Sequence, residues 1–230
     1  MNTAFDPGRV EAICFDIDGT LANTDDAYVQ RITGALYPLG LLMSEQRRRR
    51  FARRLVMAAE MPANAITTLL DRLSLDQTLG AVLNTLHRLR GEKEPTDIML
   101  ISGIRPMLET LVGHYPLSIV TAREEQSTEN FLRVTGLGPF FHCVVSARTC
   151  HRAKPHPAPV RWAASQMGVS TQACIMVGDT TVDMRAGISA GAQAVGVLCG
   201  FGRRRELERA GAHMILQNTA ELTEVLLEAQ

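Results

Sequence analysis

Short runs of apolar residues alternate with amphipathic stretches along most of the chain. The first run, Ala12–Phe15, is unbroken, as is typical of a strand buried on both faces. Similar runs predict further strands at residues 117–120, 142–146, 174–177, 194–198 and 214–216. Apolar residues at helical spacing predict helices at residues 104–112, 125–134, 157–167, 181–190, around 205 and 220–227. Strands that alternate with helices favour a parallel sheet, so we predict an α/β core of the Rossmann-like type.

Residues 25–90 have a different pattern, with helical periodicity and no convincing strand. Four helices are predicted there, at residues 25–37, 44–59, 62–72 and 76–90. A polar segment containing Pro95 follows and is typical of a linker. We therefore predict an α/β core formed by residues 1–20 and 97–230, and an α-helical cap domain, residues 21–96, inserted after the first strand.

The composition indicates a folded protein without a strong overall charge. Of the 230 residues, 46% are apolar and 21% are charged, which suffices for an ordinary core, and the formal net charge is zero. A neutral chain has no overall field that attracts nucleic acid or a membrane surface, so we expect neither as a partner. No apolar run approaches the length of a membrane span, and the first ten residues lack the pattern of a secretion signal.

The five cysteines are an odd number, which argues against a fold held together by disulfides. Together with the missing secretion signal, they lead us to expect a cytoplasmic protein. Cys143, Cys150, His151 and His156 cluster loosely in the sequence, but their spacing matches no common zinc pattern. We therefore interpret them as ordinary structural or surface residues.

Two aspartates, Asp16 and Asp18, directly follow the first predicted strand. Side chains two residues apart in an extended chain point the same way, so both carboxylates emerge at the carboxyl end of a buried strand, where open α/β sheets bind ligands. Adjacent negative charges are costly unless a cation is near, and Mg²⁺ prefers oxygen ligands. The alternative, two solvated turn residues, fits a buried strand poorly. We expect Gly19 to supply a backbone conformation that other residues resist and Thr20 to be structural.

Three more polar signals follow later in the chain. Thr121 comes after a strand, Lys154 lies in a loop before a helix, and the segment Gly-Asp-Thr-Thr-Val-Asp at 178–183 follows another strand. Because parallel strands end at one edge of a sheet, the strand-borne groups are expected to meet in one crevice. Each also has a structural interpretation: a helix cap for Thr121 or Asp179, a solvated side chain for Lys154 and a first-turn acid for Asp183.

The order and spacing of these motifs resemble the haloacid dehalogenase superfamily, specifically its helical-cap phosphatases of the phosphoglycolate phosphatase type. The residues that carry the resemblance are Asp16-Ile17-Asp18-Gly19-Thr20, Thr121-Ala122-Arg123, Lys154-Pro155 and the segment 178–183. It covers nearly the whole chain, because the predicted helical insert lies where that family has its cap. The resemblance implies Mg²⁺-dependent hydrolysis of small phosphate monoesters through an aspartyl-phosphate intermediate.

The resemblance also implies a role for each residue. Asp16 would be the nucleophile, and Asp18 the acid that protonates the leaving alcohol and then the base that activates water. Thr121 would donate a hydrogen bond to a phosphoryl oxygen, and Lys154 would neutralise negative charge. The substrate would be bound by Thr121, Ala122, Arg123 and Lys154.

For Mg²⁺, the resemblance implies ligands from Asp16, from Asp18 through its backbone carbonyl, and from Asp179. Asp183 would support the metal or Lys154. The dehalogenases of this superfamily lack the aspartate that corresponds to Asp18, so its presence favours phosphoryl transfer.

Several alternatives stay open at this point. A phosphomutase would use the same intermediate but return the phosphoryl group to a sugar. Pyrophosphate or phosphonate hydrolysis is less favoured, since a phosphonatase would need a cap lysine and Lys93 lies at the linker. A non-catalytic binding protein on this fold is the third, although no predicted catalytic position carries an inert residue. We expect a small phosphorylated metabolite as the partner, and a monomer or homodimer.

A run of arginines distinguishes the second predicted cap helix. Its members are Arg47, Arg48, Arg49, Arg50, Arg53 and Arg54. Such a run is most often a solvated helix face. Alternatively, one or two of these side chains face the cleft and attract an anionic substrate, or the run binds nucleic acid, which the neutral net charge disfavours.

Overall fold

The computed structural model of the protein describes residues 4–23 and 98–228. They belong to one of the two units into which the chain divides, residues 1–25 together with 98–230, while residues 26–97 form the other. The predicted cap helices, the arginine run and Lys93 lie outside the described residues. The cap and the exact domain boundaries therefore stay predictions.

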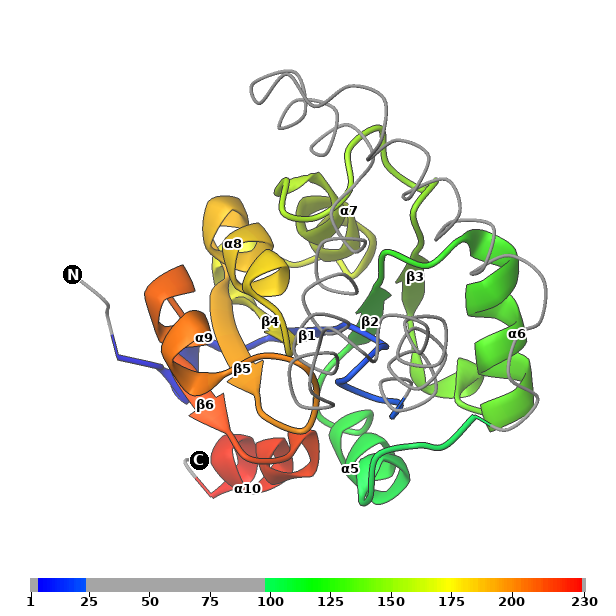
Figure 1. Cartoon of the computed structure of the whole chain (residues 1–230), viewed down its shortest axis with the longest axis horizontal. Coiled ribbons are helices and arrows are strands. Elements are labelled where there is room, and N and C mark those ends of the chain that lie inside the picture. The colour runs from blue at the N-terminus through cyan, green and yellow to red at the C-terminus, as the bar shows by residue number, and fades with distance from the viewer. Residues whose placement is uncertain (1–3, 24–97, 229–230) are drawn as a thin grey trace, which may run out of the picture. The chain divides into compact units, whose positions relative to one another are not determined.

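Six strands form one parallel sheet in the order β3-β2-β1-β4-β5-β6 (Figure 1). The strands are β1 (Ala12–Phe15), β2 (Leu117–Val120), β3 (Cys143–Val145), β4 (Cys174–Gly178), β5 (Gln193–Val197) and β6 (Met214–Leu216). In β1, Phe15 pairs with Ile119 of β2 on one side and with Val177 of β4 on the other. The strand order thus reverses at β1, as in doubly wound sheets, and the predicted α/β class is confirmed.

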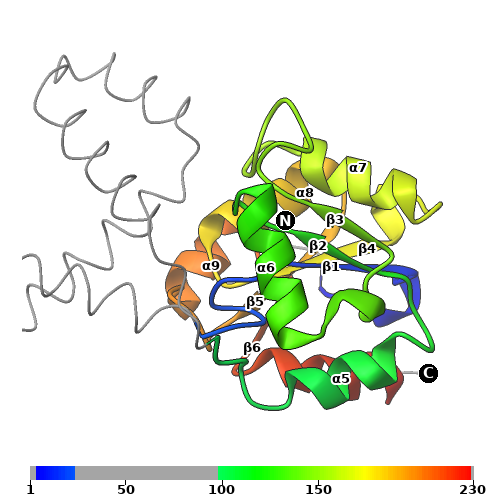
Figure 2. The same cartoon turned by 90° about the vertical axis from the view of Figure 1, so that its right-hand side faces the viewer.

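Helices connect the strands and cover both faces of the sheet. They are α5 (Ile104–Leu111), α6 (Glu125–Thr135), α7 (Ala158–Gln166), α8 (Thr181–Ala190), α9 (Arg204–Ala210) and α10 (Leu222–Leu227). Short 3-10 turns occur at Pro7–Arg9, Gly138–Phe140, Thr171–Ala173 and Thr219–Glu221. Figures 1 and 2 show α7 and α8 on one face, and α5 and α10 on the other. None of the helices in the described part of the chain has the length and apolar character needed to span a membrane.

The core is divided between the two faces of the sheet by the alternation of side chains along each strand. Ile13 of β1 belongs to the apolar cluster that includes Leu108 of α5 and Leu222 of α10. Its neighbour Cys14 points to the other face and joins a cluster with Ala163 of α7. Both β1 residues are fully buried, which explains the unbroken apolar run in the sequence.

A close approach of α8 to the sheet fixes the position of the segment that follows β4. A Cβ added at Gly187 of α8 would lie only 2.8 Å from the Cβ of Met176 in β4. The absent side chain lets the helix pack directly on the strand. As a result, the first turn of α8 is held next to the carboxyl end of β4.

Every strand and the helices α5 to α8 begin and end within two residues of the predicted bounds. Gly136 and Gly191 end α6 and α8 in the left-handed conformation, with φ of 64° and 95°. The last predicted helix, residues 220–227, begins with a 3-10 turn, because the Asn218 side chain accepts a hydrogen bond from the Ala220 N–H. That cap starts a 3-10 turn, and α10 begins only at Leu222.

Candidate functional site

The carboxyl ends of the three central strands bring Asp16, Thr121 and Asp179 to the same edge of the sheet. Asp16 follows β1, and its N–H donates to the Val177 carbonyl of β4 at 3.0 Å. Asp179 directly follows Gly178, the last residue of β4. Thr121 follows β2. This edge, at the point where the strand order reverses, is where open α/β sheets bind their ligands.

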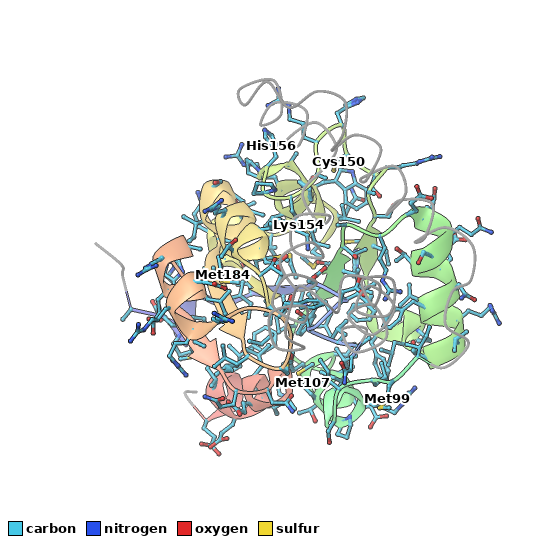
Figure 3. The ribbon with its side chains drawn as sticks, in the orientation of Figure 1. Met99, Met107, Cys150, Lys154, His156 and Met184 are labelled. Atoms are coloured by element: carbon cyan, nitrogen blue, oxygen red, sulfur yellow. The ribbon has the colours of Figure 1, made fainter. Side chains whose placement is uncertain are left out.

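Lys154 reaches this edge from the loop before α7 and joins two of the aspartates. Its Nζ donates to Asp16 Oδ1 at 2.9 Å and to Asp183 Oδ1 at 2.6 Å. All three side chains are buried. Figure 3 shows Lys154 toward the centre of the molecule, whereas Cys150 and His156 lie farther out beside α7.

Burial and neighbouring charges have opposite effects on the pKa values of Asp16 and Lys154. Burial raises the pKa of Asp16 from 3.8 to about 7; the ammonium of Lys154 opposes that rise, and the charges of Asp183 and Asp18 add to it. Burial alone would lower the pKa of Lys154, but the charges of Asp16 and Asp183 outweigh it and raise that pKa. Lys154 is therefore expected to be protonated at neutral pH.

Asp183 has a second function at the start of α8. Thr180 is the N-cap of this helix, and both its N–H and its hydroxyl donate to Asp183 Oδ2, at 3.1 and 2.6 Å. The two residues form a capping box, which leaves the other oxygen of Asp183 for Lys154. Asp183 is thus held rigidly, and the N-cap is Thr180 rather than Asp179.

Asp179 is enclosed by backbone from two other segments. The Phe201 N–H donates to Asp179 Oδ2 at 2.6 Å. A Cβ added at Gly19 or at Gly200 would overlap that same oxygen. The prediction for Gly19 is confirmed, since its φ is 71°. These close approaches shape a cradle around the carboxylate that only glycine permits.

The three buried carboxylates suit a divalent cation. One oxygen from each of Asp16, Asp179 and Asp183 lies within 4.8 Å of the others. Hard cations such as Mg²⁺ and Ca²⁺ prefer oxygen ligands of this kind. Lys154 supplies one positive charge against three carboxylates, so two further positive charges would balance the group when all three are ionised. The donor set therefore fits a metal ion.

Asp18 and Arg123 form a further ion pair beside this group. Arg123 Nε donates to Asp18 Oδ2 at 2.8 Å, and Arg123 Nη2 donates to Asp18 Oδ1 at 2.6 Å. The two parallel hydrogen bonds match the planar guanidinium to the carboxylate. Asp18 thus faces Arg123 with its side chain, while Asp16, two residues earlier, faces Lys154.

The turn after β2 carries the predicted phosphate-binding residues. Thr121 is buried, and its Oγ1 accepts a hydrogen bond from the Arg123 N–H at 3.2 Å. Ala122 lies between them and is exposed. The Arg123 carbonyl accepts from the Ala147 N–H at 2.8 Å, which ties the turn to the segment after β3.

Other residues singled out in the sequence have structural contacts. The Cys143 thiol points at the Ala163 carbonyl, and His156 Nδ1 accepts a hydrogen bond from the Ala158 N–H. Among residues 4–23 and 98–228, the aspartate trio is the only group of His, Cys, Asp and Glu that could hold a metal. Thr20 is buried, and its carbonyl accepts from Thr219 Oγ1 at 2.7 Å, as expected of a structural residue.

Three of the contacts that build the site were not among the sequence-based predictions. The spacing Thr180-x-x-Asp183 is that of a capping box, so this one was visible in the sequence. The packing of Gly200 on Asp179 was not, because a pair of glycines in a loop also marks an ordinary turn. The guanidinium of Arg123 lies over the ring of Phe131, and this contact had no signal in the sequence.

Comparison with known proteins agrees with the fold and the motifs. A model of the haloacid dehalogenase-like hydrolases matches residues 13–197. Pyrophosphatase PpaX of Bacillus velezensis is 31% identical over 194 residues, which cover 82% of this chain and 83% of that protein. Phosphoglycolate phosphatase of Escherichia coli is 23% identical over 233 residues, with 94% and 92% covered.

A solved structure, that of a hydrolase from Pseudomonas syringae, has the same fold. Its TM-score is 0.74 at 24% identity, and the match covers 95% of this chain and 98% of that one. The matched family region includes both the Asp16 and the Asp179 segments. The chain therefore belongs to the haloacid dehalogenase-like hydrolases, as its sequence motifs predicted.

Proposed function

We propose that this protein is a Mg²⁺-dependent phosphatase that hydrolyses small phosphate monoesters through an aspartyl-phosphate on Asp16. The observation that carries the proposal is the position of Asp16. Its carboxylate lies at the end of β1, 2.9 Å from the buried Lys154 ammonium. It also belongs to the same cluster of three carboxylates as Asp179. A nucleophilic carboxylate beside a fixed cation suits attack on a phosphate dianion.

The reaction has two steps, and both Asp16 and Asp18 are regenerated at the end of the second step. First, an Asp16 oxygen attacks phosphorus, the bond to the alcohol oxygen breaks, and Asp18 gives that oxygen a proton. Then water attacks phosphorus, Asp18 takes a proton from the water, and the bond to Asp16 breaks. Inorganic phosphate leaves, and both carboxyl groups return to their starting state.

The remaining residues bind and hold the reacting groups. Lys154 would neutralise charge on Asp16 and on the phosphoryl oxygens, and Thr121 would donate its hydroxyl to one of those oxygens. Asp16, Asp179 and the Asp18 carbonyl would hold the metal, with Asp183 in support. Bound Mg²⁺ would supply positive charge that stabilises the transferring phosphoryl group.

Pyrophosphate is a second candidate substrate, because the relative that is 31% identical is named a pyrophosphatase. The same attack by Asp16 would apply, with inorganic phosphate as the leaving group. We also propose a cytoplasmic location, which the five free cysteines of the chain support.

The test is phosphate release from a panel of small phosphorylated metabolites and pyrophosphate, with and without Mg²⁺, by the wild type and by Asp16→Asn. The proposal expects Mg²⁺-dependent release that is lost in the variant, and the preferred compound would identify the substrate. Sugar phosphate isomerised without free phosphate would indicate a mutase instead. Release from no compound, by folded protein with Mg²⁺ bound, would favour a binding protein.

A further inference from the structure

Both the backbone and the side chain of Arg123 have fixed contacts, although this residue lies on the turn after β2. Its N–H donates to Thr121 Oγ1, and its carbonyl accepts from Ala147. Its Cζ lies 5.3 Å from the centroid of the Phe131 ring, which is fully buried in α6. A guanidinium over an aromatic face is attracted by the ring quadrupole. The backbone and the side chain of Arg123 are therefore both fixed.

The fixed guanidinium in turn holds Asp18. Both Asp18 oxygens accept hydrogen bonds, from Nε and from Nη2 of Arg123. The two side chains are only 13% and 17% exposed, so the pair is better shielded from water than an ordinary surface ion pair. Two parallel hydrogen bonds define the plane of the carboxylate, which a single bond from a lysine could not do.

We propose that Arg123 is a positioning residue for the reaction: it orients the Asp18 carboxyl and couples it to the Thr121 turn. The inference rests on the proposed function, in which Asp18 moves the proton. To carry and transfer the proton, one oxygen of Asp18 gives up its hydrogen bond from Arg123 and faces the leaving group, while the other oxygen keeps its hydrogen bond from the guanidinium. This differs from the role predicted from the sequence, in which Arg123 binds the substrate directly.

Substrates with different leaving groups can distinguish a residue that positions Asp18 from one that binds the substrate directly. An alkoxide is a poor leaving group and needs the proton from Asp18, whereas p-nitrophenolate leaves without one. The ratio kcat/KM reports the step in which the alcohol departs, provided that this step is irreversible. A residue that acts through Asp18 should therefore affect alkyl phosphates far more than p-nitrophenyl phosphate.

The experiment measures kcat/KM for both substrate types in the wild type, Arg123→Ala, Arg123→Lys, Asp18→Asn and the double variant Arg123→Ala/Asp18→Asn. We expect Arg123→Ala to lose about 10²-fold on an alkyl phosphate and under about tenfold on p-nitrophenyl phosphate. The double variant should be no slower than Asp18→Asn alone. Arg123→Lys should be intermediate, and millimolar guanidinium ion should partly restore Arg123→Ala.

Two outcomes would overturn the inference. In the first, Arg123→Ala raises KM equally for both substrates and slows the Asp18→Asn enzyme further, which is the behaviour of a substrate-binding residue. In the second, Arg123→Ala has wild-type activity on both substrates.

A measurement without substrate tests the pair itself. The ¹H–¹⁵N signal of the Arg123 Nε–H should be protected from exchange with water in the wild type and should broaden or vanish in Asp18→Asn. An unchanged signal in that variant would contradict the pairing. If the wild type released phosphate from no compound, the proposed function would fail, and this spectrum would still decide whether Arg123 holds Asp18.

Discussion

The Nζ of Lys154 lies 2.6 Å from Oδ1 of Asp183, and the same ammonium lies 2.9 Å from Asp16. One buried cation thus connects the end of β1 with the first turn of α8. These elements are far apart in the sequence, and the contact fixes the candidate nucleophile relative to the helix. The charges at this site are consequently interdependent, which leads to several predictions.

Replacing Lys154 with methionine should destabilise the protein and abolish turnover. The change keeps most of the side-chain volume but leaves Asp16 and Asp183 buried without their ammonium. Breaking a buried ion pair in this way costs about 3–5 kcal/mol. Urea unfolding of the metal-free protein measures the loss, with Lys154→Arg as the control that keeps the charge. A Lys154→Met protein with wild-type stability and activity would show that the buried ammonium is dispensable.

Asp183→Ala should cost more stability than Asp183→Asn. Asparagine keeps an oxygen that can accept from the Thr180 N–H and loses mainly the ion pair, whereas alanine also removes the capping box, at about 1 kcal/mol. Thermal unfolding of both variants tests this order. Glu125→Ala is the control, because Glu125 is an exposed acid in the first turn of α6 and should change stability by at most about 0.5 kcal/mol. Equal effects of all three variants would contradict the structural account.

Gly200→Ala should weaken metal binding. The added Cβ would overlap Asp179 Oδ2 and the Gly19 carbonyl oxygen, so the carboxylate and the backbone beside it have to shift. Displacing a supported ligand typically costs about 10-fold or more in metal affinity. The measurement is the Mg²⁺ concentration that half-activates phosphate release, together with the rise in melting temperature that Mg²⁺ produces. Gly138→Ala is the matched control, since a Cβ there has no neighbour within 4 Å. An equal response of both variants would show that the close packing of Gly200 on Asp179 does not affect metal binding.

The difference in stability between Asp16→Asn and the wild type should depend on pH in the metal-free protein. The folded pKa of Asp16 is about 7, above its value of 3.8 without burial. Between those two values the unfolded chain ionises and the folded chain does not, so Asp16 lowers stability as the pH rises from about 4 to about 7 and adds no further change above 7. The stability difference between variant and wild type should grow by at most about 1.4 kcal/mol per pH unit in that window.

This pH dependence is measured by thermal unfolding of both proteins in chelator, from pH 5 to pH 8.5. Titrations of all other groups cancel in the difference, unless they are coupled to Asp16. A difference that stays flat from pH 5 to pH 7 would mean that Asp16 is ionised throughout, with Lys154 outweighing its burial.

The sequence predicted most of the described fold because its signals are local. Ala12–Phe15 is apolar throughout since both of its faces are covered, and Gly136 and Gly191 mark the ends of two helices in the left-handed conformation. The meeting of Asp16, Thr121 and Asp179 also followed from the sequence, because parallel strands end at one edge of a sheet.

The contacts between these segments could not be predicted in the same way. Arg123 and Asp18 are 105 residues apart, and no periodicity indicates which carboxylate a guanidinium will meet. The approach of Gly200 to Asp179 depends on how two loops pack. Such contacts are set by the tertiary fold, and they decide the charge and orientation of the site.

The central claim, that Asp16 forms a covalent phosphoryl intermediate, is tested most directly by trapping that intermediate. Wild-type protein is mixed with Mg²⁺ and its preferred substrate, quenched in the steady state and reduced with borohydride, which converts an acyl phosphate to an alcohol. Mass spectrometry of the peptide around β1 should then locate homoserine at position 16, and Asp16→Asn should give none. Phosphate release by the wild type with no reduced residue at position 16, under conditions that trap a known aspartyl-phosphate, would contradict the account.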